Sequence, residues 1–125
     1  MTDKEKLFET LGELLFAVAK ADGVIQPEEK FALERFFEEH NYSSEVTWSF
    51  NYEQNKGHSV EEAYTKAIDF CKHFGPAPEY EEFIKAMKVI AKASDGIDQS
   101  EKKIINNFSN DLMTKFRKDL EIEDQ

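Results

Sequence analysis

Apolar residues recur every three or four positions along five stretches of the chain, which is the spacing of one face of an α-helix. Turn-forming residues separate the stretches. A Ser-Val-Glu-Glu sequence at 59–62 has the pattern of a helix-capping box, and Gly75 and Pro78 interrupt the pattern before the next stretch. We therefore predict an all-α fold. The five stretches cover residues 7–18, 31–37, 60–71, 80–91 and 105–116.

The segment 42–57 departs from this pattern. Its central part, VTWSFNYE, alternates apolar and polar residues in the manner of a β-strand. No second strand pattern exists for it to pair with, and a single strand would leave backbone hydrogen-bonding groups without partners. Tyr42, Val46, Trp48 and Phe50 can also share one broad helical face. We therefore predict a helix here as well.

Length and charge limit the classes of function. A chain of 125 residues suits a single domain, here 1–125. The net charge of -10 speaks against a nucleic-acid partner, because such binding depends on neutralising phosphates, and it favours cations or basic proteins. The longest apolar run, 14–19, is too short to insert into a membrane, and the first residues lack a signal-peptide pattern. We expect a cytoplasmic protein, with Cys71 in the core.

One stretch of the chain occurs twice. AKADGVIQPEEK at 19–30 returns as AKASDGIDQSEK at 91–102. Each copy has the pattern of a helix, a turn and a second helix. A glycine suits the left-handed position that ends the first helix, and a glutamate at the third position of the next helix can reach back to its N-cap. The predicted turn glycines are Gly23 and Gly96, the N-caps are Gln26 and Asp98, and the glutamates are Glu29 and Glu101.

The repeated turn is not a calcium-binding EF-hand loop. Its second half fits that motif, but the positions that supply the first ligands carry no suitable oxygens. Counting back from the last glutamate, these positions hold Val18 and Lys20 in the first copy, and Ile90 and Lys92 in the second.

Two aspartates in the turns have two possible roles. An acidic residue at the end of a helix opposes the helix dipole, so turn formation alone does not explain Asp22 and Asp95. Either aspartate can accept the free N–H groups that begin the next helix. Alternatively, the turns bind calcium or magnesium through Asp22, Glu29, Asp95, Asp98 and Glu101. Because calcium takes about six to eight oxygens, such a site would be weak and would need both turns, backbone carbonyls or water.

The repeated residues resemble the tellurite-resistance TerB-like family. Its hallmark is a helix ending in Ala-x-Ala-Asp-Gly, followed by an apolar residue and then a glutamate, as at 19–29 and, more loosely, at 91–101. The resemblance covers two hairpins near 5–39 and 79–120. It implies a helical bundle with internal duplication in a bacterial stress- or tellurite-response protein, and acidic residues that bind divalent cations. A related domain begins some membrane-anchored J-domain co-chaperones, but this chain has no His-Pro-Asp tripeptide.

Three functions are compatible with these observations. The first is a non-enzymatic TerB-like module that binds a protein partner and is tuned by a divalent cation. The second is a metal-dependent hydrolase that uses pooled carboxylates, although the chain has only three histidines and no Glu-x-x-His pair of the di-metal type. The third is a purely structural protein–protein interaction domain. No catalytic residue is predicted.

Overall fold

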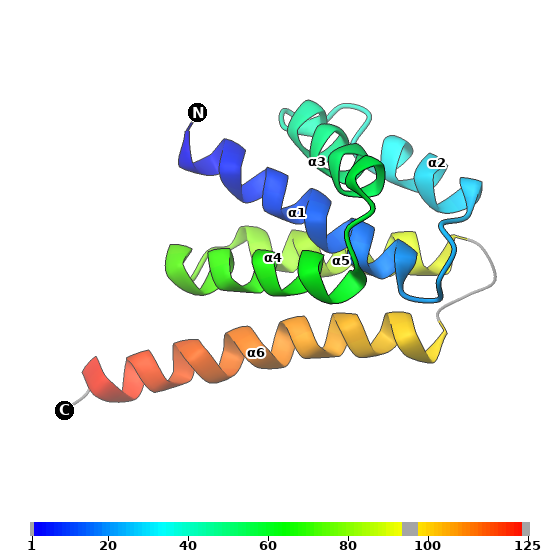
Figure 1. The fold of residues 1–125 in the computed structure, drawn as a ribbon. Helices are drawn as coiled ribbons and strands as arrows, with labels where there is room; N and C mark the ends of the chain where they lie inside the picture. Colours follow the sequence, from blue (N-terminus) through cyan, green and yellow to red (C-terminus); the bar gives the residue numbers. More distant parts are fainter. Residues whose placement is uncertain (1, 94–97, 124–125) are drawn as a thin grey trace.

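The computed structural model describes residues 2–93 and 98–123, which fold into six α-helices without a β-strand (Figure 1). The all-α prediction is confirmed. The segment with strand-like alternation is helix α3, as predicted, but its aromatic residues do not share one face, because Phe50 is buried and Trp48 is 57% exposed. The helices are α1 (Asp3–Lys20), α2 (Pro27–Phe36), α3 (Ser43–Lys56), α4 (Val60–Phe74), α5 (Glu79–Lys92) and α6 (Gln99–Glu123).

The ends of the helices follow the predicted capping residues. Gly23 has φ of 99°, a conformation that residues with a Cβ rarely adopt, and it lies in the turn that separates α1 from α2. Pro27 takes the first position of α2, where its missing N–H costs nothing. Ser59 and Glu62 form the predicted capping box at the start of α4. Gly96 lies outside the described residues.

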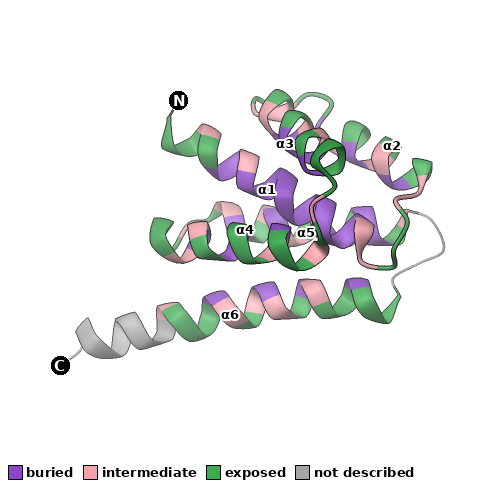
Figure 2. Ribbon diagram, in the orientation of Figure 1, coloured by how far each residue is buried: buried purple, intermediate pink, exposed green. Residues whose placement is uncertain are grey.

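Helix α1 lies at the centre of the structure. It packs most extensively against α3 and α4 and also contacts α5 and α6 (Figure 1). Figure 2 shows buried residues along most of its length, consistent with its nearly continuous apolar sequence from Leu14 to Ala19. Each buried leucine or phenylalanine contributes about 1.5–3 kcal/mol relative to an exposed one. The core also contains Cys71, as predicted.

The α1–α3 contact is unusually close because a glycine faces it. A Cβ added to Gly12 would lie 2.5 Å from the carbonyl oxygen of Val46 and 2.7 Å from Cβ of Ser49, both on α3. Close approach also allows a direct link between the helices. The hydroxyl of Ser49 donates a hydrogen bond of 2.5 Å to the carbonyl oxygen of Glu9.

The two helical hairpins, α1–α2 and α5–α6, share one hydrophobic cluster with α3 and α4. Helix α2 packs against α5 of the other hairpin, and α6 lies along α1, α4 and α5. This arrangement brings the ends of α1 and α5 and the starts of α2 and α6 to the same end of the molecule (Figure 1). Within the described residues, no helix is long and apolar enough to cross a membrane.

Candidate functional site

The two repeated turns bring a pair of buried glutamates together. Glu29, in the first turn of α2, has no exposed surface, and Glu101, in the first turn of α6, is 2% exposed. One oxygen of each carboxyl group accepts a backbone hydrogen bond at the start of its own helix. The distances are 2.7 Å from Gln26 N to Glu29 Oε1 and 3.2 Å from Asp98 N to Glu101 Oε1. The predicted capping role of both glutamates is therefore confirmed.

Among the residues that the structure describes, the second oxygen of each carboxyl group has no hydrogen-bond donor. Oε2 of Glu29 and Oε2 of Glu101 are both buried and unpartnered. The two side chains are close enough to hydrogen-bond to one another, which requires one of them to hold a proton. With both groups ionised, two acceptors face each other away from water, an arrangement that a proton or a cation would relieve.

Burial raises the pKa of both carboxyl groups above its usual value. The negative charge of Asp22 raises the pKa of each further, while the backbone hydrogen bonds oppose the shift. Because the two groups interact directly, they titrate as a pair. The pair therefore holds a proton at a higher pH than an ordinary glutamate does.

Two other capping glutamates show that burial distinguishes this pair. Glu5 and Glu62 make the same backbone hydrogen bond at the starts of α1 and α4, but Glu62 is exposed and Glu5 is only partly buried. Their capping hydrogen bonds to Thr2 and Ser59 lower their pKa. The capping motif by itself is thus a structural feature. The buried oxygens of Glu29 and Glu101, which face each other, distinguish the starts of α2 and α6 from those of α1 and α4.

The other predicted ligands occupy different positions. Asp22 is exposed, and its Oδ1 accepts a hydrogen bond of 3.1 Å from Val24 N, within the turn itself and not from the first N–H groups of α2. Asp98 is the N-cap of α6, where its Oδ1 accepts a bond of 2.8 Å from Glu101 N. Asp95 lies outside the described residues.

Within residues 2–93 and 98–123, no three His, Cys, Asp or Glu side chains converge in a way that suits a metal ion. The described part of the site supplies two inward-facing oxygens, from Glu29 and Glu101. A bound cation would therefore need further oxygens from water or from other groups of the two turns.

The family of the chain is shown by comparison with known families. A family model described as tellurite resistance protein TerB matches residues 8–117. The chain belongs to the TerB family. The match includes both turns and both buried glutamates, so the family resemblance that the Asp-Gly turns indicated is confirmed. A significant match was found neither among curated proteins nor among solved structures.

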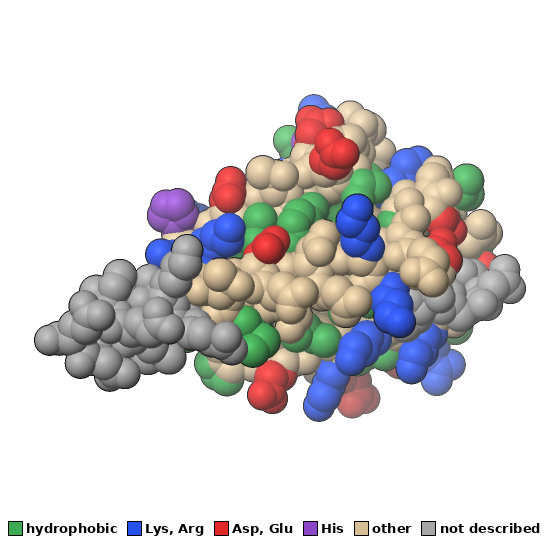
Figure 3. All heavy atoms as spheres, turned by 90° about the horizontal axis from the view of Figure 1, so that it is seen from below, with side chains coloured by type: hydrophobic (Ala, Val, Ile, Leu, Met, Phe, Trp, Pro, Cys, Tyr) green, Lys and Arg blue, Asp and Glu red, His purple; other side chains and the backbone are tan. Residues whose placement is uncertain are grey.

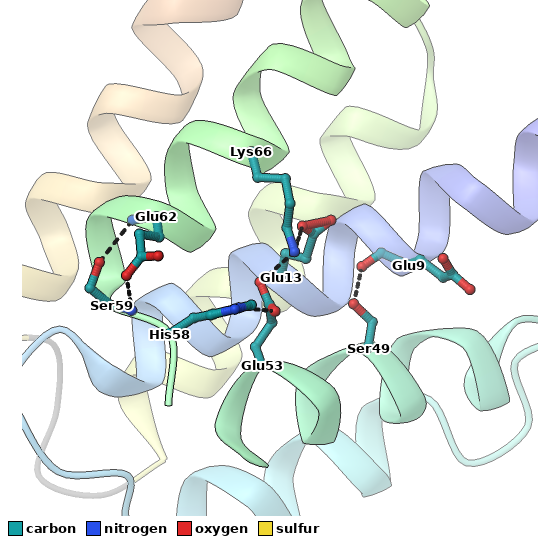
Figure 4. A network of polar contacts seen from close by, with 8 residues as sticks. All are labelled: Glu9, Glu13, Ser49, Glu53, His58, Ser59, Glu62 and Lys66. Carbon is teal, nitrogen blue, oxygen red and sulfur yellow. Dashed lines mark hydrogen bonds and ion pairs between the residues drawn. The ribbon is translucent and has the colours of Figure 1, made fainter. Parts of the chain in front are cut away.

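This TerB-family protein also contains a second buried polar cluster, which the sequence did not predict (Figure 4). Lys66 of α4 reaches two carboxylates on neighbouring helices. Its Nζ lies 3.1 Å from Oε2 of Glu13 on α1 and 3.0 Å from Oε1 of Glu53 on α3. The other oxygen of Glu53 lies 2.7 Å from Nδ1 of His58. The cluster joins three helices around one ammonium group.

The electrostatics of this cluster differ from those of the paired glutamates. Burial raises the pKa of Glu13 to about 7, although Lys66 opposes that shift. Burial alone would lower the pKa of Lys66, but its contacts with Glu53 and Glu13 outweigh burial and raise it. The space between these carboxylates already holds a cation, the lysine itself. In the part of the chain that the structure describes, no ion pair joins Glu29 or Glu101 to a basic side chain, which makes this pair the better candidate for binding a cation.

Proposed function

We propose that this TerB-family protein is a non-enzymatic module of the stress or tellurite response that binds a divalent cation, calcium or magnesium, between its two repeated turns. Glu29 and Glu101 are the principal ligands. The observation that carries the proposal is the pair of buried Oε2 atoms at the junction of the two hairpins, for which residues 2–93 and 98–123 supply no donor. Asp22, Asp95 and Asp98 are the candidates for the outer part of the site.

The chemistry of the pair suits a hard cation. Calcium and magnesium prefer carboxylate oxygens, and a double positive charge would compensate both buried negative charges at once. Because one ligand belongs to each hairpin, a bound cation would also fix the starts of α2 and α6 relative to one another. Water would complete the coordination, so the affinity is expected to be modest.

Thermal melting tests the proposal. The wild type is compared with Glu29→Gln, Glu101→Gln and Asp22→Asn, each with and without millimolar calcium or magnesium at constant ionic strength and neutral pH. Glu62→Gln is a matched control, because Glu62 caps its helix in the same way but is exposed and has no facing carboxylate. Binding to the folded state raises the melting temperature with the logarithm of the cation concentration.

The wild type and Glu62→Gln should respond to the cation, and Glu29→Gln and Glu101→Gln should not. Asp22→Asn should also lose the response, although Asn keeps the hydrogen bond to Val24 and should fold normally. An unresponsive wild type would refute cation binding and leave the pair as a proton-sharing structural element. A response retained by both glutamine variants would place the cation elsewhere. Two bound metals about 3.5–4 Å apart would favour a hydrolase instead.

A further inference from the structure

The outer sides of α2 and α5 form an apolar groove of about 910 Å³. Phe31 is 59% exposed and Val89 is 39% exposed, so large apolar side chains of both helices face solvent here. Phe36 connects the groove to the core, because its side chain is half-buried and packs against the core cluster. The apolar lining consists of Pro27, Phe31, Ala32, Phe36, Val89 and Ala93.

Positive charges border this groove. Arg35 and Lys92 line it, and Cζ of Arg35 lies 5.8 Å from the ring centroid of Phe31. Lys85 and Lys88 are exposed on α5 and precede Lys92 by seven and four positions, which places all three on one side of that helix. Glu28 is the acidic residue of the lining.

This concentration of positive charge contrasts with a net charge of -10 for the chain. Figure 3 shows several Lys and Arg side chains close together on the face seen from below, with some Asp and Glu side chains near them. Lys92 is the last residue of α5. The α2–α5 groove therefore differs from the rest of this acidic protein in its charge and in its exposed apolar side chains.

We propose that the α2–α5 groove binds an amphipathic α-helix of a partner protein, one whose apolar stripe is flanked by Asp and Glu. The apolar residues of that helix would contact Phe31, Phe36 and Val89, and its carboxylates would pair with Arg35 and the lysines of α5. Helices that dock in grooves use apolar residues at positions i, i+3 or i+4, and i+7, with charge setting the specificity.

Three other occupants fit the groove less well. A small molecule needs a pocket that covers most of its surface, whereas Phe31 and Val89 are too exposed to enclose one. A second copy joined by a two-fold axis would bring the same basic border of each copy into one interface. A flat anionic membrane would match the charge, but a groove between two helices is concave and suits a convex helix better.

The test uses defined peptides and the full chain. The first probe is a synthetic peptide of about 18 residues, long enough to form a helix, with leucines along one face and glutamates on both flanks. The second probe carries lysines in place of the glutamates. Binding is measured by fluorescence anisotropy, and the bound surface is mapped by the amide chemical shifts of the labelled protein. Vesicles of phosphatidylcholine and phosphatidylserine form a third arm.

The acidic peptide should bind at least tenfold more tightly than the basic one, more weakly at high salt, and should shift amides of α2 and α5. Phe31→Ser and Arg35→Glu should each weaken binding at least tenfold. Met113→Ser, which removes an equally exposed apolar side chain on α6, should leave affinity unchanged. All three side chains lie outside the buried core, so folding is expected to persist, and circular dichroism checks it.

Several results would overturn the proposal. Absence of binding by the acidic peptide would refute the docking of an acidic helix. Equal binding of both peptides would show that charge does not determine which helix binds. Chemical shifts confined to other helices would place the docking surface elsewhere. Vesicle binding that Phe31→Ser abolishes would make the groove a lipid-binding face. Dimerisation in sedimentation equilibrium that Phe31→Ser reverses would make it a contact between copies.

Discussion

The ammonium group of Lys66 lies 3.0 Å from Oε1 of Glu53, a carboxylate whose side chain has no exposed surface. The same ammonium group is 3.1 Å from Oε2 of Glu13. Lys66 is itself half-exposed, so it brings a positive charge from the surface to two buried negative charges (Figure 4). The helices α1, α3 and α4 are thus joined by a contact that none of them could form alone.

Replacing Lys66 with methionine should destabilise the fold, because it leaves Glu13 and Glu53 buried without their cation. We expect a loss of roughly 2–3 kcal/mol, below the 3–5 kcal/mol of a fully buried pair because Lys66 is partly solvated. Urea unfolding at neutral pH measures the change. Lys103→Met, at an exposed position of α6, is the control. A difference between the two variants of less than about 0.5 kcal/mol would contradict a stabilising role for the cluster.

Stability should also rise when the pH falls from about 8 to about 5. The pKa of Glu13 is raised from 4.5 to about 7 in the folded protein, mainly by burial, with Glu53 and Glu9 adding to the shift and Lys66 opposing it. The folded state therefore binds more protons than the unfolded state between these values, and its stability is lost as the pH rises through the folded pKa. The pKa of Glu29 and Glu101 is shifted in the same direction.

Unfolding free energies measured across this range test the sign. Glu13→Gln should reduce the change of unfolding free energy with pH. Adding Glu29→Gln should reduce this change further, because the two sites are separate. Glu62→Gln should leave the slope unchanged in this range, because the pKa of Glu62 is lowered. If the wild type instead became less stable as the pH falls from about 8 to about 5, the raised pKa of Glu13 and of Glu29 would be contradicted.

The sequence predicted the helices and their ends because these depend on local patterns. The apolar stripes locate the helices, and residues such as Gly23, Pro27 and Ser59 determine where they begin or end. Even the ambiguous segment 42–57 was correctly predicted as helix, since it had no strand to pair with. The family resemblance rested on a motif of similar short range.

The candidate site was predicted only in part, because its essential feature is a long-range contact. Glu29 and Glu101 were each identified as capping residues, but their unpartnered oxygens result from how α2, α5 and α6 pack together. The Lys66 cluster was missed for the same reason. A glutamate at position 13, inside a nearly continuous apolar run, was the one available local signal.

A methyl group at position 12 should destabilise the protein even though alanine is the better helix former. Alanine gains about 1 kcal/mol over glycine in a helix interior. At this position, however, the added Cβ would lie 2.5 Å from the carbonyl oxygen of Val46, which forces α1 and α3 apart. Overpacking of this kind costs typically about 1–3 kcal/mol, and here it acts on backbone atoms that cannot rotate away.

We therefore expect Gly12→Ala to have a net loss of up to about 2 kcal/mol in urea unfolding. Gly23→Ala is a useful comparison, because its Cβ would meet no atom within 4 Å and its cost comes from the positive φ alone. Only Gly12→Ala should disturb the contact between Ser49 and Glu9, which amide chemical shifts in α3 report. A stabilised Gly12→Ala variant would mean that the two helices separate more easily than their close packing indicates.

Replacing Glu29 with glutamine should stabilise the protein at about pH 8 when no cation is added. The amide oxygen of glutamine can keep the hydrogen bond from Gln26 N, and its NH2 group can donate to Oε2 of Glu101. The substitution thus imitates a protonated Glu29 and removes one buried negative charge. Since each unit of pKa shift corresponds to about 1.4 kcal/mol, a gain of about 1 kcal/mol or more is expected.

The gain should disappear at about pH 5, where wild-type Glu29 already holds a proton, and it should shrink at neutral pH when calcium or magnesium is present, because the cation compensates only the wild-type pair. Thermal melts at both pH values, with Glu62→Gln as the exposed counterpart, separate these effects. Glu62→Gln should be neutral or slightly destabilising at both, since its carboxylate gains from ionisation. If Glu29→Gln is destabilising at about pH 8, the folded protein must already compensate the charge of Glu29 there, which would contradict a raised pKa for this carboxyl group.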